Sequence, residues 1–176
     1  MTLAAPRRRT ALKALALASL TASTDFALGA QARWLPWPAR RKTPQVALID
    51  LDGAPWQLAQ EAGHPVLLNF WASWCEPCRA EMQSFAVLER QFAATGLKVV
   101  AVNFKEAADT VRRFRAWGGP SGAWLRDSYG EAADAFGVRT FPTSVLVDRQ
   151  GRARLRVVGE VDWADPPVHQ KLATWV

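Results

Sequence analysis

The chain has 176 residues, a length that suits one domain and a leader. Hydrophobic residues make up 49% of the sequence, enough for a globular core, and the formal net charge is +6. Residues 1–32 carry +3 of that charge, and the +3 that remains is too small to indicate nucleic-acid binding. The later arginines occur in short clusters, which we interpret as solvated faces, with attraction of an acidic partner or a membrane surface as the alternative. They are Arg112, Arg113, Arg115, Arg152, Arg154 and Arg156.

Residues 1–32 have the three regions of a bacterial export signal. A basic start at residues 7–9 precedes an apolar run over residues 11–20, and an A-x-A cleavage site ends at Ala32. The run has about ten residues, whereas a membrane-spanning helix needs roughly twenty, so we expect cleavage near Ala32 rather than a membrane anchor. The paired arginines also resemble a twin-arginine leader, so the Sec and twin-arginine routes both stay open. The structural alternative is an amphipathic surface helix.

The segment after the leader, residues 33–45, is rich in proline and charge and is predicted to be an irregular lead-in. The folded domain is predicted to span residues 46–176. Its first half contains apolar runs suited to strands, a loop, and a helix whose apolar residues follow helical spacing and which ends at a glycine. These elements are a strand at 46–51, a buried strand at 66–71, a loop at 73–78 and a helix at 76–95 before Gly96.

The second half of the domain alternates in the same way and ends in a predicted β-hairpin and a helix. The elements are a strand at 97–104, a helix at 106–117, a short helix at 129–136, hairpin strands at 143–148 and 152–158, and a helix at 166–176. The order of these elements predicts an α/β domain with a central mixed β-sheet and helices on both faces.

Both cysteines of the chain, Cys75 and Cys78, lie in one CxxC motif between a buried strand and a helix. A small secreted protein held together by disulfides carries more cysteines at wider spacing, so the motif favours redox chemistry. The helix N-terminus favours a thiolate at Cys75, which we expect to attack substrate disulfides. Cys78, one turn into the helix, is expected to be less exposed and to resolve the mixed disulfide. Pro77 fits the first helical turn because it has no N–H to satisfy.

A CxxC motif is also found in metal sites. A closed zinc site needs four ligands, and the chain has no third cysteine and only two histidines, His64 and His169. We therefore predict no structural metal. Two thiolates can hold soft Cu(I), so a copper-binding metallochaperone stays an alternative.

Three segments of the chain carry a family resemblance. Residues 69–82 read NFWASWCEPCRAEM, residues 137–143 read GVRTFPT, and residues 145–151 read VLVDRQG. They resemble the TlpA/ResA-like thioredoxins, the group that includes the cytochrome c maturation reductases called DsbE or CcmG. The resemblance covers roughly residues 44–165. It implies a thioredoxin fold, dithiol–disulfide exchange, and no cofactor beyond the redox-active Cys75–Cys78 disulfide.

The resemblance also implies roles for particular residues. Pro142 would be a cis-proline facing the cysteines, although its sequence context equally fits an ordinary proline at the start of a strand. An acidic residue at the position of Glu81 would tune the cysteines. Glu81 lies three residues after Cys78 on the same helical face, where a carboxylate raises thiol pKa values and can exchange a proton. The residues expected at the catalytic centre or in contact with substrate also include Trp74, Glu76, Pro77, Thr140 and Phe141.

Asn69 stands where ordinary thioredoxins have a buried aspartate, so Glu81 is predicted to take over proton handling. The alternative for Glu81 is a solvated carboxylate paired with an arginine. Trp74 is expected to cover the cysteines and offer an apolar platform, whereas Trp71 is expected to pack in the core.

Two residues depart from the family pattern. Gln83 follows Met82 where many members have proline, so the helix is expected to lack its usual kink. Phe141 precedes Pro142 where smaller or β-branched residues are common, so its ring is expected to narrow the substrate groove.

The charges beside the cysteines predict a reductant. Strong oxidants stabilise their reduced thiolate, whereas Glu76 and Glu81 disfavour a thiolate. We expect a monomeric periplasmic protein that reduces disulfides in apocytochrome c or copper-site assembly proteins. The resemblance implies that a membrane electron donor of the DsbD or CcdA type recharges it. The alternatives are the Cu(I) metallochaperone and an oxidase or isomerase that makes disulfides.

Overall fold

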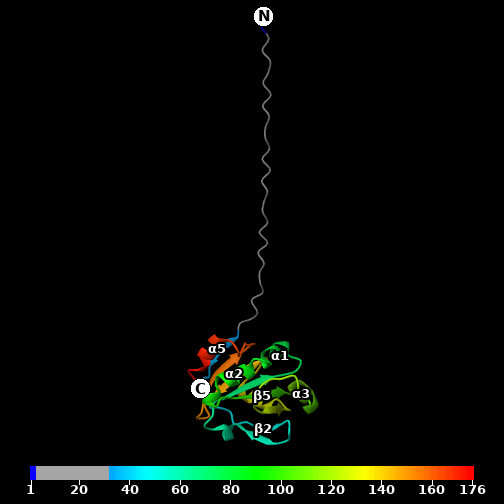
Figure 1. The fold of residues 1–176 in the computed structure, drawn as a ribbon, viewed down its shortest axis with the longest axis vertical. Helices are drawn as coiled ribbons and strands as arrows, with labels where there is room; N and C mark the ends of the chain where they lie inside the picture. The colour runs from blue at the N-terminus through cyan, green and yellow to red at the C-terminus, as the bar shows by residue number, and fades with distance from the viewer. Residues whose placement is uncertain (3–31) are drawn as a thin grey trace.

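The computed structural model describes residues 1–2 and 32–176, so the predicted export signal lies almost entirely outside the described residues. The described chain forms an eight-stranded sheet with the order β1-β8-β7-β4-β5-β6-β2-β3 (Figure 1). The central strand β4 (Val66–Trp71) lies between β5 (Lys98–Phe104), which is parallel to it, and β7 (Thr143–Val147), which is antiparallel. The sheet is therefore mixed, as predicted.

The remaining strands extend the sheet on both sides of this centre. β8 (Ala153–Val158) pairs with β7 and completes the predicted hairpin. On the other side, β6 (Trp124–Asp127) runs parallel to β5, and β2 (Ala47–Asp50) and β3 (Pro55–Gln57) follow as antiparallel strands. β3 and β6 are absent from the predicted elements, because runs of three and four residues are too short to show a clear period.

The lead-in predicted to be irregular over residues 33–45 begins instead with a strand, β1 (Arg33–Pro36), which pairs antiparallel with β8. This pairing gives partners to backbone groups of β8 that would otherwise form an open edge. The ring of Trp34 also packs against Trp163, with ring centroids 6.1 Å apart. Prolines suggested an irregular segment here, but an edge strand tolerates them because some of its N–H groups face away from the sheet.

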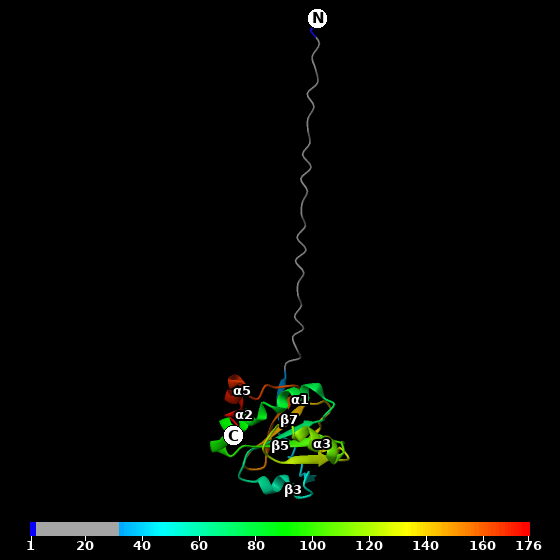
Figure 2. The ribbon, with the colours of Figure 1, turned by 45° about the vertical axis from the view of Figure 1, so that its right-hand side comes forward.

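Five α-helices flank the sheet in the described chain: α1 (Glu76–Met82), α2 (Phe85–Gln91), α3 (Ala108–Arg115), α4 (Glu131–Phe136) and α5 (Pro166–Leu172). Two 3-10 helices, Leu58–Glu61 and Ala93–Thr95, complete the helical elements. The helices bury side chains in two clusters, one on each face of the sheet: Phe85, Val111 and Leu172 belong to one, and Phe136 to the other. Helices therefore cover both faces, as predicted, and α2 and α5 lie side by side in both views (Figure 1 and Figure 2). No helix of residues 1–2 and 32–176 is both long and apolar enough to span a membrane.

The single helix predicted over residues 76–95 is broken at Gln83 and Ser84. The Ser84 hydroxyl donates to the backbone carbonyl of Glu81 at 2.6 Å and accepts from the backbone N–H of Trp163 at 3.0 Å. A side chain that bonds to the helix backbone in this way competes with the helical hydrogen bonds and bends the helix. The expectation of an unbroken helix in the absence of proline is therefore wrong, because the serine interrupts it.

Candidate active site

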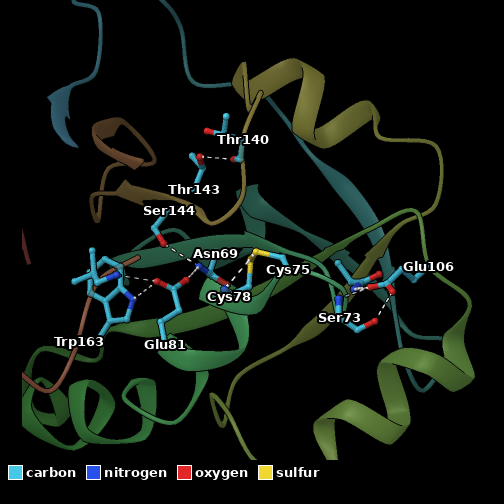
Figure 3. Close-up of a disulfide and its surroundings, with 12 residues drawn as sticks. Asn69, Ser73, Cys75, Cys78, Glu81, Glu106, Thr140, Thr143, Ser144 and Trp163 are labelled. Atoms are coloured by element: carbon cyan, nitrogen blue, oxygen red, sulfur yellow. Dashed lines mark hydrogen bonds between the residues drawn. A yellow bond between two sulfur atoms is a disulfide. The ribbon is translucent and has the colours of Figure 1, made fainter. Parts of the chain in front are cut away.

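The cysteine pair lies where the chain leaves β4 and enters α1, and its two sulfurs form a disulfide (Figure 3). Cys75 is the N-cap residue of α1, and its Sγ accepts a hydrogen bond from the backbone N–H of Cys78 at 3.3 Å. Cys75 is 6% exposed, whereas Cys78 is completely buried. Cys75 is thus the sulfur that a partner can reach, and Cys78 is placed to attack it from inside. Pro77 lies in the first turn of α1 and is exposed.

Glu106 fixes the loop in front of the cysteines. Its Oε2 accepts from the backbone N–H of Ser73 at 2.7 Å and from Nδ2 of Asn103 at 2.7 Å, and its Oε1 accepts from the Ser73 hydroxyl at 2.5 Å. Figure 3 shows this group beside Ser73, on the loop that carries Cys75. Glu106 is absent from the predicted site residues. Its position just after β5 was a usable signal, because β5 is parallel to β4 and the carboxyl ends of parallel neighbours meet at one edge.

Glu81 lies on α1, three residues after Cys78, and its side chain is buried, with only 2% exposed. Its Oε1 accepts from Nδ2 of Asn69 at 2.6 Å, and its Oε2 accepts from the Val161 backbone N–H at 3.2 Å and from Nε1 of Trp163 at 3.3 Å (Figure 3). The alternative of a solvated carboxylate paired with an arginine is therefore wrong. We call this group of four residues the buried acid site.

Burial raises the pKa of Glu81 from 4.5 to about 8, because a carboxylate without water around it is costly to ionise. The hydrogen bonds from Asn69, Val161 and Trp163 oppose this increase, and the negative charge of Glu160 adds to it. Near neutral pH the side chain therefore holds a proton that it can lose. A buried group that titrates in this range beside a dithiol is suited to give a proton to a thiolate and to accept one from a thiol.

The partners of Glu81 come from distant parts of the chain. Asn69 is on β4, where it also donates to the Ser144 hydroxyl on β7 at 3.0 Å, while Val161 and Trp163 follow β8. Sequence reasoning singled out Asn69 and Glu81 but not Val161 or Trp163. Trp163 is one of seven tryptophans outside the CxxC segment, so the sequence held no signal that distinguished it.

Glu76 behaves differently from Glu81 although it is next to Cys75. Its side chain is 77% exposed and pairs with Arg79 at 2.7 Å across one turn of α1. Water and Arg79 both screen its charge, so its predicted influence on the thiols is much weaker than that of Glu81.

An aromatic surface lies beside the cysteines and consists of Trp74, Phe141 and Phe104. The Trp74 side chain is 65% exposed, and its ring meets Phe141 edge to face at a centroid distance of 5.8 Å. Phe141 in turn packs on Phe104 at 4.9 Å. The structure thus places Phe141 against Trp74 of the cysteine loop, and the narrowing of the substrate groove by its ring stays a prediction. Trp71 is fully buried in the core, as expected.

The Phe141–Pro142 peptide bond is cis. Pro142 immediately precedes β7, whose first residue, Thr143, lies opposite Phe70 on β4. Because β4 leads directly into the cysteine loop, this register brings the segment 140–142 to the same edge of the sheet. Thr140 is exposed there, and its carbonyl accepts from the Thr143 hydroxyl at 2.8 Å. Thr140, Phe141 and Pro142 therefore lie at the edge of the sheet from which the cysteine loop starts.

No three side chains of the types that ligate metals gather into a cluster within residues 1–2 and 32–176. The cysteine pair is the one group singled out from the sequence for soft metals. Binding of Cu(I) by the two thiolates is a question for titration of the reduced protein.

A reachable N-cap cysteine, a buried second cysteine and a buried acid define the site of a dithiol–disulfide exchange protein. A mixed sheet with the CxxC motif at the end of a central strand is the matching architecture. Known proteins agree with this class. The family model described as the AhpC/TSA family matches residues 39–156, and the chain belongs to this family.

Named relatives narrow the class. The chain is 31% identical over 126 residues to the thiol-disulfide oxidoreductase ResA of Geobacillus thermodenitrificans, covering 72% of each chain. It is 33% identical over 116 residues to ResA of Bacillus subtilis, covering 66% of this chain and 65% of that protein. A putative thiol:disulfide interchange protein DsbE from Chlorobium tepidum has a similar structure, with a TM-score of 0.66, 32% identity and coverage of 76% of this chain and 91% of that one. The protein is a thioredoxin-fold thiol–disulfide oxidoreductase of the ResA/DsbE type.

Proposed function

We propose that the protein is exported and acts in the periplasm as a monomeric reductase of disulfides in other proteins. The observation that carries this proposal is the buried acid site next to Cys78. An ionised Glu81 repels a thiolate, and a protonated Glu81 supplies a proton to it, so both forms disfavour the thiolate state that strong oxidants stabilise. The Cys75–Cys78 disulfide is then the relatively stable form, and the dithiol readily gives up two electrons.

The reaction has two exchange steps. The Cys75 thiolate attacks one sulfur of a substrate disulfide, forms a mixed disulfide and releases the other substrate sulfur as a thiolate, which takes a proton from solvent. Cys78 then passes its proton to the Glu81 carboxylate and attacks Cys75 Sγ, which releases the second substrate thiolate. The substrate gains two electrons, and the enzyme is left with the Cys75–Cys78 disulfide.

Recharging reverses these steps. A donor thiolate attacks Cys75, the thiolate of Cys78 leaves, and the protonated Glu81 gives it a proton. A second donor thiolate then frees Cys75. A pKa near 8 supports this cycle, because Glu81 can hold the proton in one half and release it in the other at physiological pH.

The partners follow from the family resemblance and the leader. The substrates are cysteine pairs of apocytochrome c or of copper-site assembly proteins, and the donor is a membrane protein of the DsbD or CcdA type. The basic and apolar regions of residues 1–32 support export, either by the Sec or by the twin-arginine route, with cleavage near Ala32. The cysteine pair itself carries the two electrons, so the reaction needs no further cofactor.

The reduction potential tests the direction of electron flow. We expect a value of about −270 mV, that of thioredoxin, or lower when the protein is equilibrated with a dithiothreitol series. A value of about −120 mV, that of the oxidant DsbA, would contradict the proposal. Titration of the reduced protein with Cu(I) tests the metallochaperone alternative, which requires tight binding that a reductase does not need.

A further inference from the structure

A hollow of about 620 Å³ lies between α1 and α3, and Phe141 is not among the residues that line it. It begins at Ser73 and Glu76, which bracket Cys75 in the sequence. α1 and α3 lie next to one another in both views of the fold (Figure 1 and Figure 2). We call this feature the α1–α3 hollow. Of the site residues expected from the sequence only Glu76 lines it, although it starts within two residues of the reactive sulfur.

The walls of the hollow are largely apolar and end in an exposed tryptophan. Met82 and Phe114 line it, and Trp117 stands at its rim with 84% of the side chain exposed. The Trp117 backbone is held, because its carbonyl accepts from Nε2 of Gln83 at 2.9 Å. The ring itself remains in water. A contiguous apolar hollow with an exposed aromatic ring is typical of a surface that binds another chain.

The hollow also carries an available positive charge. Arg112 and Arg115 on α3 and Arg79 on α1 each have a carboxylate within salt-bridge distance. Arg113 lines the hollow, and its guanidinium donates a hydrogen bond to the Thr110 hydroxyl at 3.3 Å. Among the described residues no carboxylate lies within salt-bridge distance of Arg113. Its charge is therefore free to pair with a carboxylate of a bound chain.

We infer that the α1–α3 hollow binds the substrate protein next to its attacked cysteine, by taking an aromatic or aliphatic side chain on Trp117 and a neighbouring carboxylate on Arg113. This inference rests on the proposed function and adds a sequence preference to it. A hollow of 620 Å³ holds one or two side chains, whereas a folded donor domain would need about 800 Å² of surface on each partner. The hollow therefore fits an extended, unfolded segment. The substrate then crosses Cys75 from the aromatic surface to the hollow.

The test compares two disulfide-bearing peptides that differ at one position. Both carry a tryptophan near the reactive cysteine, and next to it one has an aspartate and the other a lysine. The protein is expected to reduce the aspartate peptide with the higher kcat/KM. In Arg113→Glu this preference for aspartate over lysine falls about tenfold, mainly through KM, because an attraction becomes a repulsion. Arg115→Glu makes the same charge change on α3 outside the hollow and is expected to leave the preference within twofold.

Trp117→Ala separates the apolar contact from the charge. It is expected to lower kcat/KM for both peptides relative to hydroxyethyl disulfide, which has no side chain or carboxylate to place in the hollow, while the aspartate preference persists. Equal preferences in Arg113→Glu and Arg115→Glu would overturn the inference. So would a Trp117→Ala variant that reduces hydroxyethyl disulfide and the peptides at the same relative rates as the wild-type protein. Either result would also follow if the hollow served the electron donor instead.

A binding measurement keeps this inference separate from the proposed direction of electron flow. Peptides with serine in place of cysteine are titrated into the oxidised protein, and isothermal titration calorimetry measures binding. Tighter binding of the aspartate peptide that Arg113→Glu abolishes would support the hollow even if the protein proved to be an oxidant. No difference between the two peptides in the wild-type protein would overturn it.

Discussion

Two glutamates on the same short helix differ in their exposure to water: Glu76 is on the outer side and Glu81 on the inner side. Glu76 is adjacent to Cys75, yet its side chain lies in water and pairs with Arg79. Glu81 is three residues beyond Cys78, yet it is sealed beneath the helix with a pKa raised to about 8. Distance along the sequence therefore says little about which carboxylate acts on the dithiol. Access to water decides it, because screening weakens an exposed charge and desolvation alters a buried one.

The largest effect on activity is expected from substitution of the cysteines themselves. Cys75→Ser removes the reachable sulfur and is expected to abolish turnover. Cys78→Ser keeps the attack but removes the resolving sulfur, so mixed disulfides with substrates should accumulate. A turnover assay with a disulfide-bearing peptide checks the first variant, and non-reducing electrophoresis of cell extracts checks the second. Failure of Cys78→Ser to trap any covalent adduct would argue against the exchange mechanism.

The inner side is tested by Glu81→Gln, which keeps the shape of the side chain but cannot donate or accept the proton. The reduction of the Cys75–Cys78 disulfide by dithiothreitol at neutral pH is expected to slow by about a hundredfold, the lower end of what a general acid contributes. Stopped-flow fluorescence measures this rate. A rate close to that of the wild type would remove Glu81 from the proton path.

The same variant has a second signature in the stability of the oxidised protein. Because the folded-state pKa is raised from 4.5 to about 8, the folded protein holds the proton more tightly than the unfolded chain between these values. The contribution of this proton to the free energy of unfolding is fully present below pH 4.5 and is lost as the pH rises to about 8. Urea unfolding of the wild type relative to Glu81→Gln should show a loss of roughly 4 kcal/mol across that window. A constant difference would mean that Glu81 has an ordinary acidity.

An intermediate effect is expected at Glu106, which holds the cysteine loop from the β5 side. Glu106→Ala leaves the buried Nδ2 of Asn103 and the Ser73 N–H without their acceptor, so unfolding should become easier by about 1–3 kcal/mol. Glu106→Gln is the matched control. Its amide oxygen can accept both bonds, and its NH₂ can donate to the Ser73 hydroxyl. Thermal unfolding and the ultraviolet absorbance of the Cys75 thiolate should shift in the alanine variant and hardly at all in the glutamine variant.

The smallest effect is expected on the outer side. Glu76→Gln removes the charge nearest to Cys75 in the sequence, but that charge is exposed and paired with Arg79. The reduction potential is expected to change by no more than about 10 mV. Equilibration with dithiothreitol, run beside Glu81→Gln, makes the comparison direct. A larger shift of the reduction potential for Glu76→Gln than for Glu81→Gln would contradict the conclusion that the buried carboxylate has the stronger influence on the dithiol.

The central part of the fold could be predicted from the sequence because its signals are local. The apolar run of β4 and the CxxC motif after it follow from residues that are neighbours in the chain. The same holds for the hairpin of β7 and β8 around its turn. The edge strand β1 could not be predicted, because its pairing depends on β8, more than a hundred residues away, and not on its own pattern.

The candidate site divides in the same way. Cys75, Cys78 and Glu81 are linked by helical spacing, so sequence alone brings them together. The groups that set the properties of Glu81 and Cys75 come from elsewhere: Trp163 follows β8, and Glu106 follows β5. Trp163 has no sequence motif around it, and Glu106 is marked only by its position after β5. They matter because of hydrogen bonds that exist only once the sheet is assembled.

Glu81 is enclosed by Val161 and Trp163, which follow β8, so its surroundings are completed only after β8 has been synthesised. A chain that has emerged and folded through β8 already holds both cysteines and Asn69, but it lacks the Val161 and Trp163 donors and the indole ring that shuts out water. At that stage Glu81 lacks two of its three hydrogen-bond donors. The stretch that follows β8 therefore completes the surroundings of Glu81, and a product truncated after β8 would carry an intact CxxC motif without the Val161 and Trp163 donors.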